Sequence, residues 1–559
     1  MLSMLAAILA QLFHPEMYPI KHRRNSNTGN RIFRKVVFTT VCICLWSILL
    51  SCSSKPVDLR TLAPADSLIY LESNDLAAAI QPIVDSDAFN RAAASKPDLS
   101  ALKGVQLAIA VTGFETAEKQ VTDEASVLSF RPHFVAIADT HAWNWQAKTF
   151  TENQLGEFVN KIYGGGIQLD TDSKNGGTNY VWTAEDGRKA YAFVIDSLVY
   201  FGNDQSSIEK CIAVRKGEAD AFAKSGKAPN AGGNLAIGYI SPEGVAQLSN
   251  IIGTTQAKES GEEAEVQSFV ARILPQILRG AISEASWTAS NGEQGVEDKV
   301  TLTTNADVTS VLSETLAPGD ANDKSPLEFI PNNVPSATRY NLKNPQIAWR
   351  SVLLTTQKLT DTTTGNILTQ FSGSFFEPYA VRDPEGFLGS VGNDILTAKF
   401  DEEGEKPVVI ATVKDADKLK KSLLPELKPD KQKSDELAAE ILTSPNGDAA
   451  AFVENKMIAG DAESVFKCLQ AKKSGDNLAK TTAAQQLAAS KAPAATVALD
   501  TQTAPALAAV LSEKKAGDTN TASRYFTETR YTKNGIDRRV VSDFGIIGSI
   551  IAELAEDEQ

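Results

Sequence analysis

Residues 190–212 read AYAFVIDSLVYFGNDQSSIEKCI, and residues 449–469 read AAAFVENKMIAGDAESVFKCL. Each stretch predicts a β-hairpin followed by a helix, because a short β-branched or aromatic alternation gives way to helical spacing. The two stretches share Ala-Phe-Val, then Gly, and then the spacing Ser, Lys, Cys at 207, 210, 211 and at 464, 467, 468. We infer that the chain contains an internal repeat, with two copies of one structural unit.

Three further pairs of segments recur in the same order on either side of these stretches. They are Tyr70–Asn74 with Tyr340–Asn344, Leu235–Tyr239 with Thr496–Asp500, and Asn291–Val300 with Asn534–Val540. The repeat places copy one at residues 57–316 and copy two at residues 327–555. Between them, residues 317–326 form a polar linker with Pro and Gly.

Local patterns predict an α+β unit with a mainly antiparallel sheet and helices packed on one face of it. Short β-branched or aromatic runs predict strands at Leu107–Val111, Phe134–Ala138, Tyr180–Thr183, Tyr191–Ile195 and Leu198–Phe201. A capping-box pattern at Thr151 and Gln154 predicts the start of a helix whose apolar stripe contains Leu155, Phe158, Val159 and Ile162. In copy two, Asp415 is the expected cap before Leu419 and Leu423.

Composition places the chain among globular proteins. It has 559 residues, of which 42% are hydrophobic and 22% charged. These values exclude a mainly disordered, collagen-like or polytopic membrane chain, and the length requires several domains. The net charge of −14 argues against a nucleic-acid partner that is held by its phosphates.

The first fifty residues predict export. A basic stretch from Lys21 to Lys35 precedes the apolar segment Val36–Leu50, which is too short for a comfortable membrane span and suits the apolar region of a signal peptide. The segment ends in Leu49-Leu50-Ser51-Cys52. This order resembles the lipobox of bacterial lipoproteins, although Leu50 departs from the small or β-branched residue usual there. The resemblance implies a leader at residues 1–51 and a lipid on Cys52 that anchors the protein to the cell membrane or outer membrane. An uncleaved N-terminal anchor is the alternative.

Met17 is an alternative start, and residues 1–16 would then lie outside the protein. The leader holds six of the 55 basic and one of the 69 acidic residues, so the chain after residue 51 has a net charge of −19. The cysteines that remain after the leader and Cys52 are Cys211 and Cys468. Both belong to apolar helical stripes and are expected to be buried and unreactive rather than paired.

The sequence contains few motifs that indicate metal or phosphate chemistry. After the leader the chain has His133 and His141, with no HExxH and no paired Cys cluster, so no metal and no cofactor is expected. The segment Asp170–Gly176 resembles a calcium loop in outline, but Lys174 stands where an oxygen ligand is required. A solvated turn is the preferred interpretation of this segment.

One motif leaves a catalytic alternative open. Ser207 with Lys210, and Ser464 with Lys467, have the SxxK spacing of serine β-lactamases and penicillin-binding proteins, in which the amine activates the hydroxyl. The chain has no Lys-Thr-Gly or Ser-Asp-Asn partner for either pair. We therefore expect a helix edge here, and an envelope serine hydrolase remains the rival.

Two aromatic clusters are the candidate partner-binding residues. Trp143 and Trp145 precede a helix, and Phe375, Phe376 and Tyr379 lie where copy two is longer than copy one. Exposed aromatic side chains can grip a protein or stack on a sugar, whereas buried ones fill a core. The copy-two cluster is the stronger candidate, because a shared fold does not require an insertion.

The tandem arrangement and the leader together resemble bacterial envelope proteins made of domains of unknown function. That resemblance brings no catalytic residues. The sequence therefore predicts a non-catalytic, lipid-anchored envelope protein with a binding or structural role, whose partner is an envelope protein or a polysaccharide. The alternatives are the serine hydrolase and a solute-binding lipoprotein, which needs a cleft between the copies.

Overall fold

The structure is a computed structural model that describes residues 57–122, 125–227, 229, 231–259, 264–320, 323–401, 404–512 and 521–556. The leader and Cys52 lie outside the described residues. Twenty strands of the described chain form a single sheet, and every pairing between them is antiparallel. The predicted α+β class with a mainly antiparallel sheet is therefore confirmed.

The strands divide equally between the two halves of the chain. Those of the first half are β1 (Ile69–Ser73), β2 (Gln106–Thr122), β3 (Ala125–Asp139), β4 (Gln168–Lys174), β5 (Gly177–Thr183), β6 (Lys189–Ile195), β7 (Leu198–Gly202), β8 (Ala236–Ile240), β9 (Ile282–Gly292) and β10 (Gly295–Thr304). Those of the second half are β11 (Ser336–Asn341), β12 (Val391–Lys399), β13 (Pro407–Val413), β14 (Lys428–Pro429), β15 (Glu440–Thr443), β16 (Asp448–Val453), β17 (Lys456–Asp461), β18 (Ala494–Asp500), β19 (Ser523–Thr532) and β20 (Gly535–Ser542).

The helical segments of each half connect these strands. In the first half they are η2 (Leu59–Thr61), α3 (Leu76–Asp85), α4 (Asp87–Ala92), η3 (Ser100–Leu102), α5 (Asn144–Phe150), η4 (Thr151–Leu155), α6 (Gly156–Tyr163), α7 (Gln205–Lys216), η5 (Phe222–Ser225), α8 (Pro242–Glu259), α9 (Ala264–Ala281) and α10 (Ala306–Thr315). In the second half they are η6 (Ser325–Phe329), α11 (Pro345–Leu359), α12 (Thr362–Phe371), η7 (Ser372–Tyr379), α13 (Pro384–Ser390), α14 (Ala416–Ser422), α15 (Lys431–Leu437), α16 (Ala462–Ser474), η8 (Leu478–Lys480), α17 (Thr482–Ala489), α18 (Thr503–Leu511) and α19 (Gly545–Glu556).

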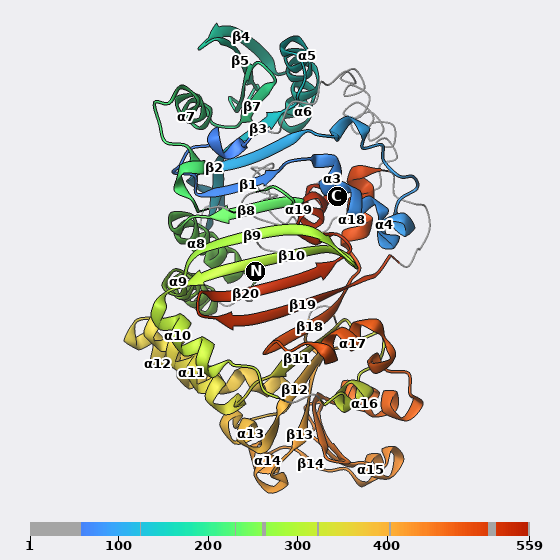
Figure 1. Cartoon of the computed structure of the whole chain (residues 1–559). Helices are drawn as coiled ribbons and strands as arrows, with labels where there is room; N and C mark the ends of the chain where they lie inside the picture. Colours follow the sequence, from blue (N-terminus) through green and yellow to red (C-terminus); the bar gives the residue numbers. More distant parts are fainter. Residues whose placement is uncertain are drawn as a thin grey trace.

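The strand pairings follow the same order in both halves. From the first-half end of the sheet to its middle the order is β4-β5-β6-β7-β3-β2-β1-β8-β9-β10. From the other end it is β14-β15-β16-β17-β13-β12-β11-β18-β19-β20. The two halves meet where β10 pairs with β20, in the middle of the elongated molecule (Figure 1).

The register of the central pair is symmetric about one point. Lys299 lies opposite Arg539, and the flanking pairs on either side are Val296 with Ser542 and Leu302 with Ile536. The turns that precede the two strands end at Gly295 and Gly535, where φ is positive and an added Cβ would come within 2.4 Å and 2.0 Å of backbone oxygen. Glycine is therefore required at both positions.

Following the strand partners outward from these two glycines aligns the halves residue by residue. Tyr70 of β1 then corresponds to Ala337 of β11, not to Tyr340 as the sequence identities suggest. Tyr70 packs in the same core as Cys211, whereas Tyr340 is on the opposite face of the sheet. The two alignments differ by three residues, and a shift by an odd number of residues along a strand moves a side chain to the other face.

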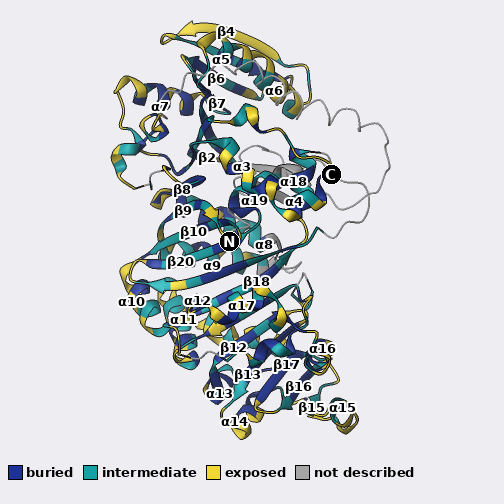
Figure 2. Cartoon of the chain, turned by 45° about the vertical axis from the view of Figure 1, so that its right-hand side comes forward, coloured by how far each residue is buried: buried dark blue, intermediate teal, exposed yellow. Residues whose placement is uncertain are grey.

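Helices cover both faces of the sheet, so the expectation of helices on one face is wrong. In β13, Val408 and Ile410 join a core with α16 and α17, while Val409 and Ala411 join a second core with α13 and α14. Both faces of these strands are apolar, and each requires its own cover. Figure 2 shows β17 largely buried between these covers, whereas β4 at one end of the sheet is exposed.

The last helix of each half packs on the other half. Helix α10 contacts α11 and β19, and α19 contacts α3 and β10. In the same way α9 contacts α11, and α18 contacts α4. The apolar cluster of α3, α4, α18 and α19 is therefore a core shared between the halves.

The predicted start of one first-half helix, with Thr151 as its cap, is wrong. The helical stretch begins with α5 at Asn144 and runs through η4 into α6, so Thr151 lies inside it rather than capping it. The Thr151 hydroxyl donates a hydrogen bond to the carbonyl of Ala147, one turn earlier. The predicted cap at Asp415 is confirmed, because its carboxylate accepts a hydrogen bond from the Lys418 backbone N–H.

Candidate functional site: an aromatic cavity in the second half

The second half carries a longer connection between two neighbouring strands than the first. Residues 342–390 join β11 to β12, whereas residues 74–105 join β1 to β2. The longer connection folds into α11, α12, η7 and α13, which lie along one side of the lower half in Figure 1. Helix α11 begins where the Asn344 side chain accepts a hydrogen bond from the Ile347 N–H, and Pro345 occupies its first turn.

A cavity of about 340 Å³ lies between this connection and the sheet, and we call it the aromatic cavity. Its floor comes from strands and includes Tyr340, Ile395, Thr397, Val409, Ala494 and Tyr531. Its cover comes from the connection and includes Trp349, Val352, Phe375, Phe376, Tyr379 and Phe387. Leu316, at the end of α10, adds a wall from the first half. This volume lies within the range typical of small-molecule sites.

Edge-to-face contacts between aromatic rings hold the cover in place. The Trp349 and Phe376 ring centroids are 5.0 Å apart with an interplanar angle of 73°, and those of Phe376 and Phe387 are 6.3 Å apart at 62°. Such pairs stabilise a particular geometry beyond simple burial. Phe376 and Tyr379 are three residues apart in η7, which places both on the same side of a 3₁₀-helix.

The polar groups of the cavity are hydroxyls. Thr397 lines the cavity together with Tyr340 and Tyr379, near enough for its hydroxyl to influence the pKa of both phenols. Burial raises the pKa of Tyr340, Tyr379 and Tyr531, and the Thr397 hydroxyl partly opposes the shift for the first two. All three phenols are therefore neutral at physiological pH. Tyr340 keeps 38% of its surface exposed, because its ring lines the open cavity.

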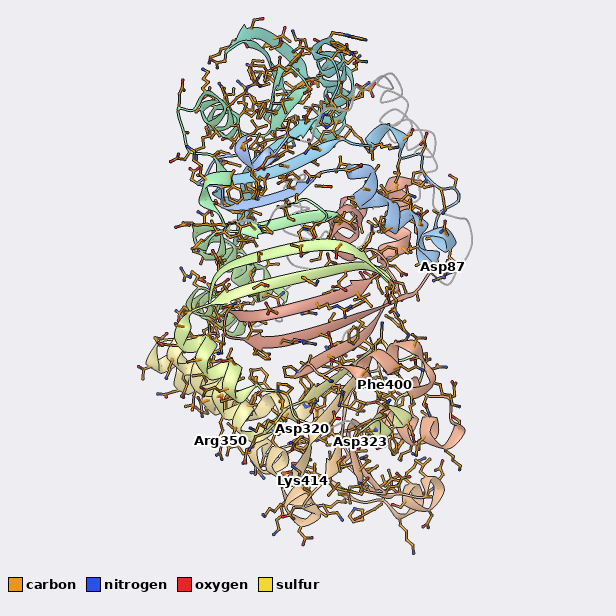
Figure 3. The ribbon with its side chains drawn as sticks, viewed as in Figure 1. Asp87, Asp320, Asp323, Arg350, Phe400 and Lys414 are labelled. Carbon is orange, nitrogen blue, oxygen red and sulfur yellow. The ribbon has the colours of Figure 1, made fainter. Side chains whose placement is uncertain are left out.

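An ion pair links two helices of this cover. Arg350 of α11 forms an ion pair with Glu385 of α13, and the Gln346 amide donates to the backbone carbonyl of Glu385. Figure 3 shows Arg350 on α11, at the outer side of the molecule. The lining residues of the aromatic cavity include no Asp, Glu, Lys, Arg or His. These contacts tie α11 to α13 and leave the cavity electrically neutral.

The predicted aromatic residues fall in two separate places. Phe375, Phe376 and Tyr379 all line the aromatic cavity, and Phe375 is 62% exposed at its edge. Trp143 and Trp145 are 68% and 64% exposed at the start of α5, near the opposite end of the molecule (Figure 1). The structure therefore brings together the three aromatic residues of the second half and does not bring the two tryptophans to them.

Sequence reasoning missed Tyr340, Trp349, Phe387 and Tyr531. Tyr340 and Tyr531 come from strands far apart in the sequence, so no local pattern connects them. Trp349 had a usable signal, since Pro345, Trp349 and Val352 are spaced as one face of a helix within the longer connection.

The two SxxK pairs have structural contacts rather than catalytic ones. Ser207 and Ser464 are fully buried, and their hydroxyls donate to the helix-capping carboxylates of Asp204 and Asp461, at 2.8 and 2.7 Å. Lys210 pairs instead with Asp66 at 2.7 Å. Lys467 pairs with Glu463, also at 2.7 Å. The geometry therefore joins each serine to a helix cap, where no substrate can reach it.

Cys211 and Cys468 are buried, as predicted. Burial raises the pKa of both thiols, so little thiolate forms at neutral pH. Each packs in the core beneath its helix, Cys211 under α7 and Cys468 under α16. Both behave as small apolar side chains.

A second, polar depression contains Asp320, Asp323 and Lys414, which Figure 3 shows near one another. One of its charges already has partners, because the Asp323 carboxylate accepts from Lys456 and from Ser325. Burial opposes the shift, but these contacts lower the pKa of Asp323 to about 2. The arrangement anchors residues that precede η6, and we do not assign it a ligand.

The segment with a calcium-loop outline, Asp170–Gly176, is an exposed edge strand that ends in a hairpin turn. Asn175 and Gly176 have positive φ, and the Asp172 carboxylate accepts a hydrogen bond from Asn179. Within the described ranges, no three His, Cys, Asp or Glu side chains lie close enough to hold a metal ion. In the same part of the chain, no helix combines the length and apolarity needed to cross a membrane.

Comparison of the chain with protein-family models, with curated proteins and with solved structures found no match.

Proposed function

We propose that the protein is a non-catalytic lipoprotein of the bacterial cell envelope that binds an apolar ligand in the aromatic cavity. The observation that carries the proposal is a neutral cavity of about 340 Å³ with aromatic walls. Aromatic side chains left around an open space have no packing partner on that side, so an apolar ligand gains both burial and contact there.

The contacts of the two SxxK pairs do not support the rival serine hydrolase. The serines of the SxxK pairs serve helix caps, and their lysines are paired with acids. Of the alternatives predicted from the sequence, the solute-binding lipoprotein agrees best with a cavity of this kind. Its site lies within the second half rather than in a cleft between the halves, with Leu316 as the contribution of the first half.

The proposal includes two copies of one α+β unit in tandem. It is supported by the matching order of strand pairings and by the register of β10 and β20, which is symmetric about Lys299 and Arg539. It is supported also by the two helices α7 and α16, each of which begins after a capping aspartate and buries a cysteine. Only the second copy carries the longer connection and the aromatic cavity.

A lipid on Cys52 would place the folded chain close to a membrane. The described chain starts at Val57, whose backbone N–H and C=O are both bonded by the Gln106 side chain at 2.8 Å. An extended chain spans about 3.5 Å per residue, so Cys52 would lie within roughly 18 Å of Val57. This short tether is the reason to expect a membrane-derived or envelope ligand.

Binding is tested with the neutral dye N-phenyl-1-naphthylamine and the full-length protein. We expect the dye to fluoresce on binding to the wild-type chain and the Phe375→Ala variant to bind it about fivefold more weakly, because the edge of the cavity loses a ring. Phe371→Ala is the matched control, since Phe371 is 60% exposed in α12 but does not line the cavity. No dye binding, or equal loss in both variants, would contradict the proposal.

The anchor is tested separately by radiolabelled palmitate in a bacterial host. We expect label on the wild-type chain, none on Cys52→Ala, and full labelling of Cys44→Ala, which changes a leader cysteine before the lipobox. Label that survives Cys52→Ala would remove lipidation at this residue and leave the cavity proposal intact.

A further inference from the structure

The chemistry inside the aromatic cavity restricts what kind of apolar ligand fits. Its lining combines aromatic and aliphatic groups with a small cluster of hydroxyls, in which Thr397 adjoins Tyr340 and Tyr379. These hydroxyls can donate to and accept from an uncharged polar group. A small number of placed polar groups in an apolar cavity is what orients a ligand.

The same lining disfavours a charged ligand group. None of the lining residues is charged at neutral pH, because a phenol is protonated there and burial raises the pKa of Tyr340 and Tyr379 further. The nearby ion pair of Arg350 and Glu385 is already satisfied. A carboxylate or ammonium carried to the cavity floor would lose its hydration and find no counter-charge.

The cavity opens at an apolar edge. Phe375 and Val352 line the cavity and are exposed there. A ligand whose apolar part is longer than the cavity would leave it past these two side chains.

Resting on the proposed function, we propose that the aromatic cavity selects a neutral amphipathic molecule that carries one hydroxyl or ester carbonyl. The uncharged polar group lies against Thr397, Tyr340 and Tyr379, and the aliphatic part extends outward past Phe375. Long-chain alcohols and neutral acyl esters have this chemistry. Free fatty acids at neutral pH do not, because they are ionised, and alkanes do not, because they leave the hydroxyl cluster without a partner.

The test is displacement of N-phenyl-1-naphthylamine from the full-length protein at pH 8 by three probes of equal chain length. These are 1-decanol, decanoate and decane, each used below its solubility limit. We expect 1-decanol to compete about tenfold better than decanoate and several-fold better than decane, because it alone satisfies the hydroxyls without bringing a charge. Equal competition by all three would overturn the selectivity while leaving binding itself intact.

Thr397→Val removes the hydroxyl with little change in shape. We expect it to reduce the advantage of 1-decanol over decane about fivefold and to leave decane competition within twofold of wild type. Thr338→Val is the matched control, since Thr338 faces Thr397 across β11 and β12 but its hydroxyl is bonded to Thr496, outside the cavity lining. An unchanged preference in Thr397→Val, or the same change in both variants, would overturn the proposal.

Discussion

The two halves of the sheet share one order of strand pairing, but they carry side chains of different size at equivalent positions on one face. In the first half, Trp287 is buried and packs with Leu71 over Gly238, where an added Cβ would come within 2.9 Å of both side chains. The corresponding positions of the second half are Thr527, Thr338 and Thr496. One half therefore closes its face with a large ring over a glycine, and the other places three small residues there.

The aromatic cavity follows from this difference. Its floor residues Tyr340, Thr397 and Tyr531 correspond to Ser73, Ile109 and Asn291 of the first half, so the hydroxyl cluster has no counterpart there. The longer connection then covers the second-half face with side chains that pack on each other as well as on the sheet. The comparison shows that strand pairing determines the arrangement of the backbone. The volume of the side chains and the segment packed over them then determine whether a closed core or an open cavity forms.

The largest effect is expected at the buried ion pair of the second half. Arg339 donates to both oxygens of Asp394 and also to the backbone carbonyls of Leu487, Ala488 and Ser490. Arg339→Ala would leave the buried carboxylate unpaired and lower the free energy of unfolding by about 3–5 kcal/mol. Urea unfolding measured by circular dichroism checks this. A loss below 1 kcal/mol would mean that the pair does not organise this half.

A smaller loss in the free energy of unfolding is expected at Asp298, through which the first half binds α19, the last helix of the second half. Asp298 accepts from the Trp287 indole at 2.8 Å and from the Ile546 backbone N–H of α19 at 2.9 Å. Asp298→Ala would leave two buried donors unpaired and cost about 2–3 kcal/mol. Arg538 is the corresponding second-half residue, and its buried Nε has no partner within the described chain. Arg538→Ala should cost under 1 kcal/mol in the same urea titration, and an equal loss at both positions would break the comparison.

The same carboxylate gives a pH dependence. Burial raises the pKa of Asp298 to about 6, against the 3.8 of an exposed carboxyl, while its two hydrogen-bond donors oppose the shift. Because the folded state holds this proton more tightly, its contribution to stability is complete below about pH 4 and is lost as the pH rises through 6. The stability of wild type relative to Asp298→Asn should therefore fall by roughly 1–3 kcal/mol between pH 4 and 7. A difference that rises or stays flat would contradict this assignment.

The smallest effect is expected at the first-half position that corresponds to Arg339. Glu72 is buried and accepts a hydrogen bond from the Tyr70 hydroxyl at 2.9 Å, and burial raises its pKa. Glu72→Gln keeps an acceptor for Tyr70 and removes a buried charge, so we expect a change within about 1 kcal/mol of wild type. A calorimetric melting curve checks it. A large loss here would show that the two halves depend equally on this polar position.

Part of the candidate site could be predicted from the sequence. The aromatic residues 375, 376 and 379 stand out because they fall where the second half is longer, and all three line the cavity. Their neighbours Tyr340 and Tyr531 could not be found in this way, since strand pairing joins segments that are remote in the chain. The matched pair Tyr70 and Tyr340 shows the same limit, because identity aligned two side chains that face opposite sides of the sheet.

The sequence by itself determined what local chemistry controls: hairpins and therefore antiparallel strands, a helix with a capping aspartate at Asp415, buried cysteines and an acidic chain. Only the tertiary structure decided the register of β10 with β20, the helices on both faces, the exchange of α10 and α19 between the halves, and the presence of a cavity. The physical reason is that turns and caps depend on a few adjacent residues. Pairing and packing depend instead on side-chain volumes brought together from distant segments, which no local pattern contains.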